Sequence, residues 1–516
     1  MEEVKILWAD DEIDLLKPHI LFLEEKGYKV FTTNNGNEAI EYLEYQQMDI
    51  VFLDENMPGL SGLETLEKIK EIDSSLPVIM ITKSEEEYIM EDAIGAKISD
   101  YLIKPVNPKQ ILLSVKKNLD KKRLVSAKTT QVYQQEFRQI SMRLNDRMDA
   151  EEWKDFYKKL VHWEIELDAS EDRGMEEIIQ MQKTESNNVF SNFYEDNYLD
   201  WINGRDNETP IMSHTLLPKM VLPQIKDDGS YPTVLICLDN FRFDQWRAIR
   251  ERVTDYFRVE NEDMYYSIIP TATSFSRNAL FAGLLPNAIE ARFGQQWDTN
   301  GGGSVDEKQL LDAMLKLHGK QLKSDFVNVN GLEEGKKLAD KISEYLHNDL
   351  LVLSFNFVDM LTHSKTDMEV IKELADDESA YRSVTSSWFE HSPLLDILKF
   401  FSEKKIPVLF TSDHGSVRVK NPVKVIGDRN TNTNLRYKRG KTLDYNAKDV
   451  FEVKQPKEAH LPAGNLSSRY IFAKSEDFFV YPNNYHHFVQ HYKNTFQHGG
   501  ISLEEILVPF VSLSPK

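Results

Sequence analysis

A short apolar run that ends at acidic or histidine residues recurs along this chain and constrains the fold more than any other feature. The clearest copy covers residues 407–410 and continues into Thr411-Ser412-Asp413-His414. A run of this length predicts a buried strand of a parallel sheet, and polar residues beyond its carboxyl end lie where open α/β sheets bind ligands. Aspartate beside histidine is a ligand pair that suits zinc, although a single copy is more often a solvated turn.

Four such runs lie near the amino terminus, at residues 4–9, 50–53, 77–81 and 99–103. Their polar ends are Asp10-Asp11-Glu12, Asp54, Thr82 and Lys104-Pro105. Amphipathic stretches between the runs predict a doubly wound parallel sheet. Carboxylates that meet at one sheet edge repel one another unless a cation joins them, and an all-oxygen set suits Mg²⁺. Asp54 is then a candidate nucleophile for phosphoryl transfer, with Lys104 and Thr82 placed to contact the phosphoryl oxygens.

This region resembles the CheY-like receiver domain of two-component response regulators over about the first 120 residues. The matching positions are Asp10, Asp11, Asp54, the segment DENMPGLSGLE, Thr82, Tyr101 and Lys104-Pro105. The resemblance implies that a sensor histidine kinase phosphorylates Asp54. It implies a Mg²⁺ held by Asp11, Asp54 and the backbone carbonyl of Asn56, with Asp10 close by. It also implies that Thr82 and Tyr101 shift on phosphorylation, and that the altered surface dimerises.

Residues 121–207 are predicted to form a helical bundle. No proline occurs between Pro108 and Pro210, and apolar residues recur at helical spacing around Trp153. No helix-turn-helix signature is present, so no DNA-binding domain is expected. A net charge of -22 also argues against broad binding to a nucleic-acid backbone.

The single cysteine, Cys237, excludes disulfides and thiolate metal sites within the chain and fits a reducing compartment. No run reaches the roughly 18 apolar residues of a membrane span, and the amino terminus lacks a signal-peptide pattern. We therefore expect a soluble, cytoplasmic protein.

From residue 208 onward strands and helices alternate again, and the predicted element ends carry seven residues with metal or hydroxyl chemistry. They are Asp239, Thr271, Asp359, His363, Asp413, His414 and His498. Six metal-type ligands and one hydroxyl divide into two three-ligand zinc sites that share a nucleophile, an arrangement suited to in-line displacement. Thr273, Ser274 and Ser276 compete with Thr271 for the hydroxyl role. His486, His487 and His491 are interpreted as surface or lid residues, although their spacing could itself bind metal.

These residues lie in the segments LICLDNFRFDQW, IPTATSFSRNALFAGLLP, FVDMLTH, TSDHGS and HGGISLEEILVP, which resemble the PglZ domain of the alkaline phosphatase superfamily. The resemblance implies that Asp239, Asp413 and His414 hold one zinc. It implies that Asp359, His363 and His498 hold a second zinc, and that Thr271 bridges the two as nucleophile. Asn240 departs from the glycine expected after the first ligand, and we expect it to narrow the approach to the metal.

The predicted architecture is therefore α/β, with a receiver over residues 1–120, helices over 121–207 and an alkaline-phosphatase-like α/β domain over 208–516. This combination resembles the PorX-type response regulators, a family associated with the type IX secretion system and gliding motility. The resemblance implies a response regulator whose dizinc domain hydrolyses phosphodiesters of nucleotides or short oligonucleotides. The alternative is a catalytically silent zinc-binding regulator, which dimerises on phosphorylation and contacts a sigma factor or the secretion machinery.

Overall fold

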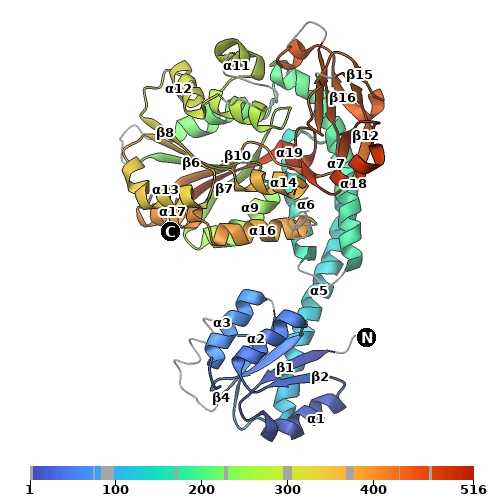
Figure 1. Cartoon of the computed structure of the whole chain (residues 1–516), viewed down its shortest axis with the longest axis vertical. Helices are drawn as coiled ribbons and strands as arrows, with labels where there is room; N and C mark the ends of the chain where they lie inside the picture. The colour runs from blue at the N-terminus through green and yellow to red at the C-terminus, as the bar shows by residue number, and fades with distance from the viewer. Residues whose placement is uncertain are drawn as a thin grey trace. The chain divides into compact units, whose positions relative to one another are not determined.

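The computed structural model divides the chain into two compact units, Met1–Gln134 and Gln135–Lys516 (Figure 1). The described residues are 4–73, 76–82, 98–168, 173–225, 231–294, 305–367, 377–428, 431–463 and 468–516. The glycine run at residues 301–303, which the sequence favours as a surface loop, lies outside them. No helix within these ranges combines the length and the apolar character needed to cross a membrane.

The first unit is built on a five-stranded parallel sheet in the order β2-β1-β3-β4-β5. The strands are β1 Lys5–Ala9, β2 Lys29–Thr33, β3 Ile50–Asp54, β4 Val78–Thr82 and β5 Asp100–Ile103. Alternate residues of β1 enter different cores, because Ile6 and Trp8 pack on one face while Leu7 and Ala9 pack on the other. A sheet buried on both faces confirms the doubly wound prediction. Only β2 was not foreseen, since this edge strand is half-exposed and lacks a continuous apolar run.

Helices connect these strands in the order of the chain. They are α1 Lys17–Glu25, preceded by the 3₁₀ turn Ile13–Leu16, then α2 Gly36–Tyr45, α3 Gly62–Ile72 and α5 Pro108–Leu144. The start of α3 is fixed by a capping box, in which Ser61 and Glu64 satisfy each other's backbone N–H groups. This cap sets where α3 begins after the loop that follows Asp54.

Two helices of the middle region, α6 Ala150–Asp168 and α7 Arg173–Ile202, confirm the helical prediction there. They pack as part of the second unit. Trp153 lies against Phe190 with ring centroids 5.2 Å apart. The hydroxyl of Tyr194 donates to the carbonyl of Ser267 at 2.8 Å, and that of Tyr266 donates to Ala150 at 2.7 Å.

A six-stranded sheet in the order β7-β20-β10-β6-β9-β8 forms the centre of the second unit. The strands are β6 Thr233–Leu238, β7 Phe257–Tyr266, β8 Ser324–Val329, β9 Leu350–Phe355, β10 Val408–Ser412 and β20 Leu507–Pro515. Strands β10, β6, β9 and β8 run parallel, while β20 is antiparallel to both β10 and β7. The carboxyl ends of these four strands therefore meet at one edge; the sequence predicted β6, β9 and β10, whereas β8 was not foreseen.

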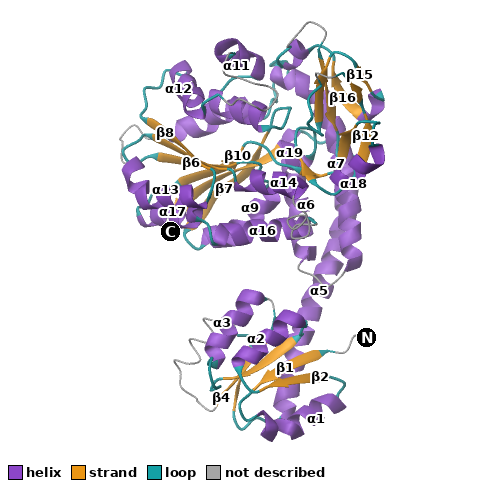
Figure 2. Ribbon diagram, in the orientation of Figure 1, coloured by secondary structure: helices purple, strands orange, loops and turns teal. Residues whose placement is uncertain are grey.

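Helices cover both faces of this sheet (Figure 2). The helices around this sheet are α9 Phe243–Thr254, α10 Asn278–Ala282, α11 Pro286–Phe293, α12 Glu307–Leu317, α13 Leu332–Lys341, α14 Phe357–Asp367, α16 Glu378–Glu390, α17 Pro393–Glu403 and α19 Leu503–Ile506. Helix α18 Tyr485–Tyr492 instead packs on Val417, Phe478 and Val480 of the short strands that follow β10. Short strands after β10 form small sheets, the largest of which has the order β14-β17-β16. Its strands are β14 Tyr437–Gly440, β16 Val450–Val453 and β17 Arg469–Ala473.

Candidate metal centres

The first unit brings Asp10, Asp11 and Asp54 together at the carboxyl edge of its sheet, with one oxygen of each within 4.8 Å of the others. Lys104 neutralises two of them, because its Nζ lies 2.7 Å from Oδ1 of Asp54 and 2.9 Å from Oδ2 of Asp10. Burial raises the pKa of Asp54, and the ion pair with Lys104 opposes that rise. Three carboxylates with one lysine fit a hard divalent cation bound by oxygen.

Two hydroxyl groups, those of Thr82 and Tyr101, lie near this edge of the sheet. Thr82 is fully buried and donates its hydroxyl to the carboxylate of Glu55. Tyr101 packs on the apolar core and shares a hydrogen bond with Thr82. The backbone N–H of Asn56 donates to Oδ2 of Asp54 at 3.3 Å. The predicted switch residues are thus adjacent, with Glu55 as an additional partner that the sequence reasoning missed.

In the second unit, Asp239 follows β6 and Asp413-His414 follow β10, and the three side chains form one cluster. We call it triad A. All three are buried, and Oδ2 of Asp413 has no hydrogen-bond partner among the described residues. Burial and the charge of Asp413 raise the pKa of Asp239 to about 6, against the opposing charge of Arg277. Burying two carboxylates, one of which has an oxygen without a hydrogen-bond partner, costs free energy. A bound cation would offset that cost.

Asp359 and His363 on α14 meet His498, which precedes Gly499-Gly500, to form triad B. His363 Nε2 lies 3.5 Å from Oδ2 of Asp359, and His498 Nε2 lies 3.8 Å from Oδ1 of the same carboxylate. Burial and the nearby His414 and His363 hold the pKa of His498 well below its usual value. A neutral imidazole is the form that ligates a metal.

The two triads are direct neighbours. The rings of His414 and His498 stack with centroids 4.5 Å apart. Asn240 joins both clusters, since its backbone N–H donates to Asp413 at 3.2 Å and its side-chain amide donates to Asp359 at 3.3 Å. Its φ of 59° explains why glycine is expected at this position, because asparagine is among the few other residues that tolerate such a conformation. Asn240 therefore positions ligands of both triads.

The hydroxyl against triad A is that of Thr273. Its Oγ1 lies 3.5 Å from Oδ1 of Asp239 and 3.4 Å from Nε2 of His414. The hydroxyl of the predicted nucleophile Thr271 lies 3.1 Å from the carbonyl oxygen of Gly500 and 3.3 Å from Oε1 of Glu505. The assignment of Thr271 as nucleophile stays a prediction, and the carbonyl of Thr271 contacts Nδ1 of His498 at 3.0 Å.

Two further charged groups of this edge were not foreseen from the sequence. Arg277 lies 2.9 Å from Oδ2 of Asp239, and it also donates to Asn328 and Ser354. Glu505 accepts from the backbone N–H of Gly500 at 2.8 Å and pairs with the buried Arg436. Both arginines come from segments distant in the chain from the carboxylates they contact, so no local pattern marks them.

The histidines at positions 486, 487 and 491 lie on or near the surface along α18, and none belongs to either triad. Imidazole nitrogens with carboxylate oxygens in three-ligand sets are typical of zinc sites with open coordination positions. The six side chains thus form two clusters, each of which could hold a metal ion, and zinc as their occupant stays a prediction.

A family profile described as the BREX system PglZ alkaline phosphatase-like domain matches residues 216–513, more than half of the chain. The chain belongs to the PglZ family. A response regulator receiver domain matches residues 6–116, and a PorX response regulator linker domain matches residues 123–202. The predicted PorX-type order of receiver, helical linker and PglZ domain is therefore confirmed.

Single relatives match through the receiver. The chain is 35% identical over 114 residues to the transcriptional regulatory protein ResD of Bacillus subtilis, covering 22% of this chain and 47% of ResD. It is 36% identical over 114 residues to a CpxR homolog of Haemophilus influenzae, covering 22% and 48%. The chain thus spans about half the length of the curated relatives it matches. A CheY-like receiver structure from Methanospirillum hungatei aligns at 28% identity with a TM-score of 0.23, covering 23% of this chain and 96% of that one.

Proposed function

We propose that this PglZ-family response regulator is phosphorylated at Asp54 and that its second unit is a zinc-dependent phosphodiesterase. The observation that carries the proposal is the pair of adjacent Asp/His triads with the hydroxyl of Thr273 against one of them. Because the matched domain is described as alkaline phosphatase-like, hydrolysis is the activity that this arrangement supports best. The orphaned Oδ2 of Asp413 supports a cation at triad A.

Zinc held by the triads would neutralise charge on the phosphoryl oxygens and lower the pKa of a bound hydroxyl or water. Thr273 is the nucleophile in this proposal. Its Oγ1 gives up its proton and attacks phosphorus while the bond from phosphorus to the leaving alcohol oxygen breaks. The alcohol leaves with a proton, and the phosphate stays on Oγ1 with its second ester group still attached. Water then attacks the same phosphorus, the bond to Oγ1 breaks, and the hydroxyl of Thr273 is restored. Asn240 holds Asp359 and Asp413 in a fixed relation through both steps.

A chromogenic diester tests the proposal directly. The zinc-loaded protein is expected to hydrolyse bis(4-nitrophenyl) phosphate, and Thr273→Val is expected to lose that activity while keeping two zinc ions by elemental analysis. Thr271→Val is the competing variant, because Thr271 is the nucleophile that the sequence predicts and its hydroxyl lies 3.3 Å from Glu505. Equal activity in Thr273→Val and the wild type would remove the proposed nucleophile. An inert wild-type protein would favour the silent zinc-binding regulator.

The receiver supports a second part of the proposal. A cytoplasmic sensor histidine kinase would transfer phosphate to Asp54 in the presence of Mg²⁺, and the altered receiver surface would promote a homodimer that regulates type IX secretion and gliding. Contact with a sigma factor or a secretion component belongs to the same output. Light scattering checks the switch, since an aspartyl-phosphate mimic should raise the apparent mass of the wild type and leave Asp54→Ala unchanged.

A further inference from the structure

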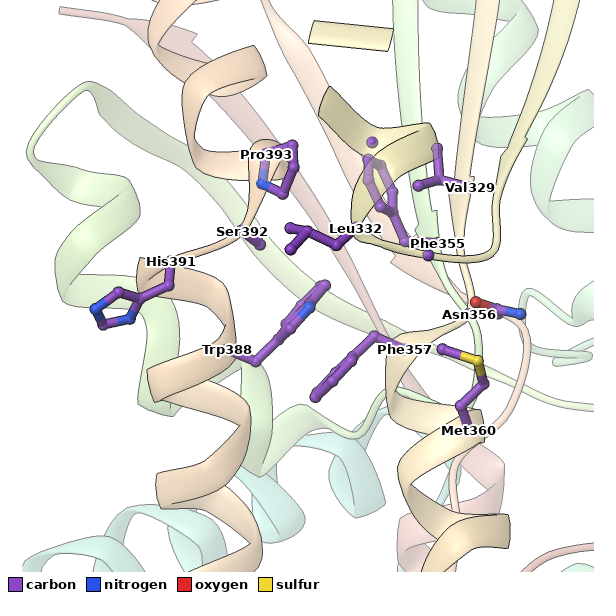
Figure 3. Close-up of a pocket in the computed structure, with 12 residues that line it drawn as sticks. Val329, Leu332, Phe355, Asn356, Phe357, Met360, Trp388, His391, Ser392 and Pro393 are labelled. Carbon is purple, nitrogen blue, oxygen red and sulfur yellow. The ribbon is translucent and has the colours of Figure 1, made fainter. Parts of the chain in front are cut away.

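Two hollows flank helix α13 in the second unit. One is an apolar cavity of about 430 Å³, whose lining includes Leu332, Phe357 and Trp388 (Figure 3). The other, which we call the β8 groove, has a volume of about 320 Å³ and lies between α13 and strand β8. Its lining includes Val327, Asn328, Asn330, Glu334, Lys337 and Lys341. Unlike the cavity, the β8 groove combines a sheet edge with charged side chains, and both features select an occupant.

Strand β8 is an edge strand of the six-stranded sheet, and no described strand pairs with its outer side. The backbone carbonyls of Lys323 and Val329 accept hydrogen bonds from the two ends of β9, at 3.1 and 3.4 Å. In a parallel ladder alternate residues bond to a given neighbour, so the odd-numbered residues of β8 bond to β9. The backbone groups of residues 324, 326 and 328 therefore face the open edge.

The opposite edge of the same sheet is protected against further pairing, and the edge at β8 is not. Strand β7 carries charged residues such as Arg258 and Glu262, has a register shift against β20, and forms a bridge with Met212 at its end. Charges, irregular pairing and cover are the means by which natural edge strands avoid other chains. Strand β8 contains no lysine, arginine or proline, and its register with β9 is continuous. Its one charged side chain, Asp325, accepts from Asn348 at 2.9 Å.

Two lysines of α13 line the β8 groove beside this edge. Lys337 and Lys341 are both exposed, and neither pairs with a carboxylate in the part of the chain that the structure describes. Glu334 also lines the groove, but its carboxylate already accepts from the backbone N–H of Asn330 at 2.8 Å. The groove thus offers two unpaired cations to a strand that pairs with β8.

The spacing of these lysines matches that of an extended chain. Helix α13 connects the parallel strands β8 and β9, so its axis runs back along β8. Residues four apart on a helix are separated by about 6 Å along the axis. Side chains on one face of a strand recur every second residue, at about 6.6 Å. A strand bound along β8 would therefore place alternate side chains opposite Lys337 and Lys341.

We propose that the β8 groove docks an extended acidic segment of a partner protein, which adds a strand to the sheet and sets carboxylates at alternate positions against Lys337 and Lys341. Strand addition takes its affinity from backbone hydrogen bonds and its selectivity from alternate side chains. A second copy of this chain fits less well, because pairing two β8 edges would bring the lysines of both copies together. No residue of the groove lining belongs to either triad, so the inference stands apart from the proposed hydrolase.

Fluorescence anisotropy with a labelled peptide tests the charge selectivity of the groove. The probe is a peptide with capped ends in which threonine alternates with glutamate, and the comparison peptide carries glutamine in place of glutamate. The full-length protein should bind the glutamate peptide saturably and the glutamine peptide about tenfold more weakly. Lys337→Gln/Lys341→Gln should weaken binding of the glutamate peptide by about the same factor, as expected for the loss of two exposed ion pairs.

Lys336→Gln/Lys399→Gln is the matched control for this removal of charge. These two lysines lie outside the groove lining and pair with Glu333 and Asp396. The control variant should bind the glutamate peptide like the wild type. Equal weakening by the two double variants would show a general effect of net charge and would overturn the docking site.

N-methylated peptides test the backbone pairing, because an N-methyl group blocks a backbone N–H and leaves the side chain unchanged. One peptide is methylated on its glutamates and another on its threonines. A strand directs alternate N–H groups to opposite sides, so one of these peptides should lose binding and the other should keep it. The proposal fails if both methylated peptides bind like the parent, if the parent does not bind, or if the glutamine peptide binds equally well. Self-association of the protein that competes with the peptide would assign the edge to a second copy instead.

Discussion

The two units both gather carboxylates at the carboxyl edge of a parallel sheet, yet they balance the charge in different ways. In the first unit Lys104 pairs with Asp10 and Asp54, and Asp11 remains exposed to solvent. In the second unit histidines share the site with the carboxylates, and Asp239, Asp413 and His414 are all buried. An open oxygen site suits an exchangeable Mg²⁺, whereas an enclosed Asp/His set suits zinc that stays bound.

The second unit also contains a buried ionic network outside its two triads. Lys183 on α7 lies 3.2 Å from both Glu164 on α6 and Glu504 on α19. Glu378 on α16 pairs with Arg242, which stands three residues after the ligand Asp239. Burial alone would raise the pKa of Glu378, but Arg242 and Lys183 hold it at about 2. The network ties the linker helices to the elements that carry the triads.

The largest expected effect is the loss of diester hydrolysis when a ligand of triad A is removed, while phosphorylation of Asp54 continues. Asp413→Ala removes a central carboxylate of triad A and should lower the rate of diester hydrolysis by about 10³-fold or more. This loss is expected to exceed the loss caused by removing a single hydrogen-bond donor from an active site. The same variant should accept phosphate from acetyl phosphate like the wild type. Asp54→Ala is the reciprocal control and should lose phosphorylation while it retains hydrolysis. Loss of both activities in either single variant would show that the sites are not independent.

The next effect concerns stability. Lys183→Met leaves Glu164 and Glu504 buried without their shared cation, which should destabilise the second unit by about 3–5 kcal/mol. Hydrogen exchange in a urea series, followed by mass spectrometry, reports the two units separately. Peptides of the receiver should be unaffected.

Lys336→Met is the matched control for this charge removal, because Lys336 pairs with Glu333 at the surface. An exposed pair contributes about 0–1 kcal/mol, so this variant should stay close to the wild type. Equal destabilisation by Lys183→Met and Lys336→Met would mean that the buried network contributes no more than a surface pair.

The sequence predicted more of the metal ligands than of their surroundings. Asp239 and Asp413 could be found because each directly follows an apolar run, and β6 and β10 bear this out. Thr271 and Thr273 could not be separated, since they stand two residues apart in an irregular segment where only the backbone decides which hydroxyl faces triad A. Spacing along the chain locates such a segment but does not orient its side chains.

The sequence also did not predict side-chain pairs between distant segments or strands that are partly exposed. Arg436 pairs with Glu505 across 69 positions of sequence, and no periodic pattern connects them. The cavity lined by residues from Val329 to Pro393 is assembled from segments that are separate in the sequence. Strand β2 was missed for a related reason, because a half-exposed edge strand carries a weak apolar signal.

The stability of the metal-free second unit should depend on pH through the buried carboxyl group of Asp239. In the absence of metal the pKa of Asp239 is raised from 3.8 to about 6, mainly by burial and by Asp413. Between these pH values the folded form binds more protons than the unfolded form, so the stability of the metal-free second unit should fall as pH rises toward about 6. Above about 6 this contribution levels off.

Zinc must displace the same proton, so its affinity should rise with pH up to about 6 and then flatten as far as Asp239 is concerned. Competition with a chromogenic chelator measures the profile. Asp239→Asn has no proton to release and should lose this part of the slope. A wild-type affinity that does not change across this pH interval would contradict the protonated, buried state of Asp239 in the metal-free form.

The smallest expected effect concerns the loop that carries His498. The hydroxyl of Thr271 accepts from the N–H of Gly499 at 2.8 Å, and its carbonyl contacts Nδ1 of His498, so Thr271 orients a ligand of triad B. Thr271→Val should weaken binding of one zinc by about tenfold, as loss of a supporting partner does, and Thr271→Ser should restore it. Zinc titration with a chelator resolves the two ions. If Thr271→Val instead binds both ions normally and loses all hydrolysis, then Thr271 is the nucleophile and Thr273 is not.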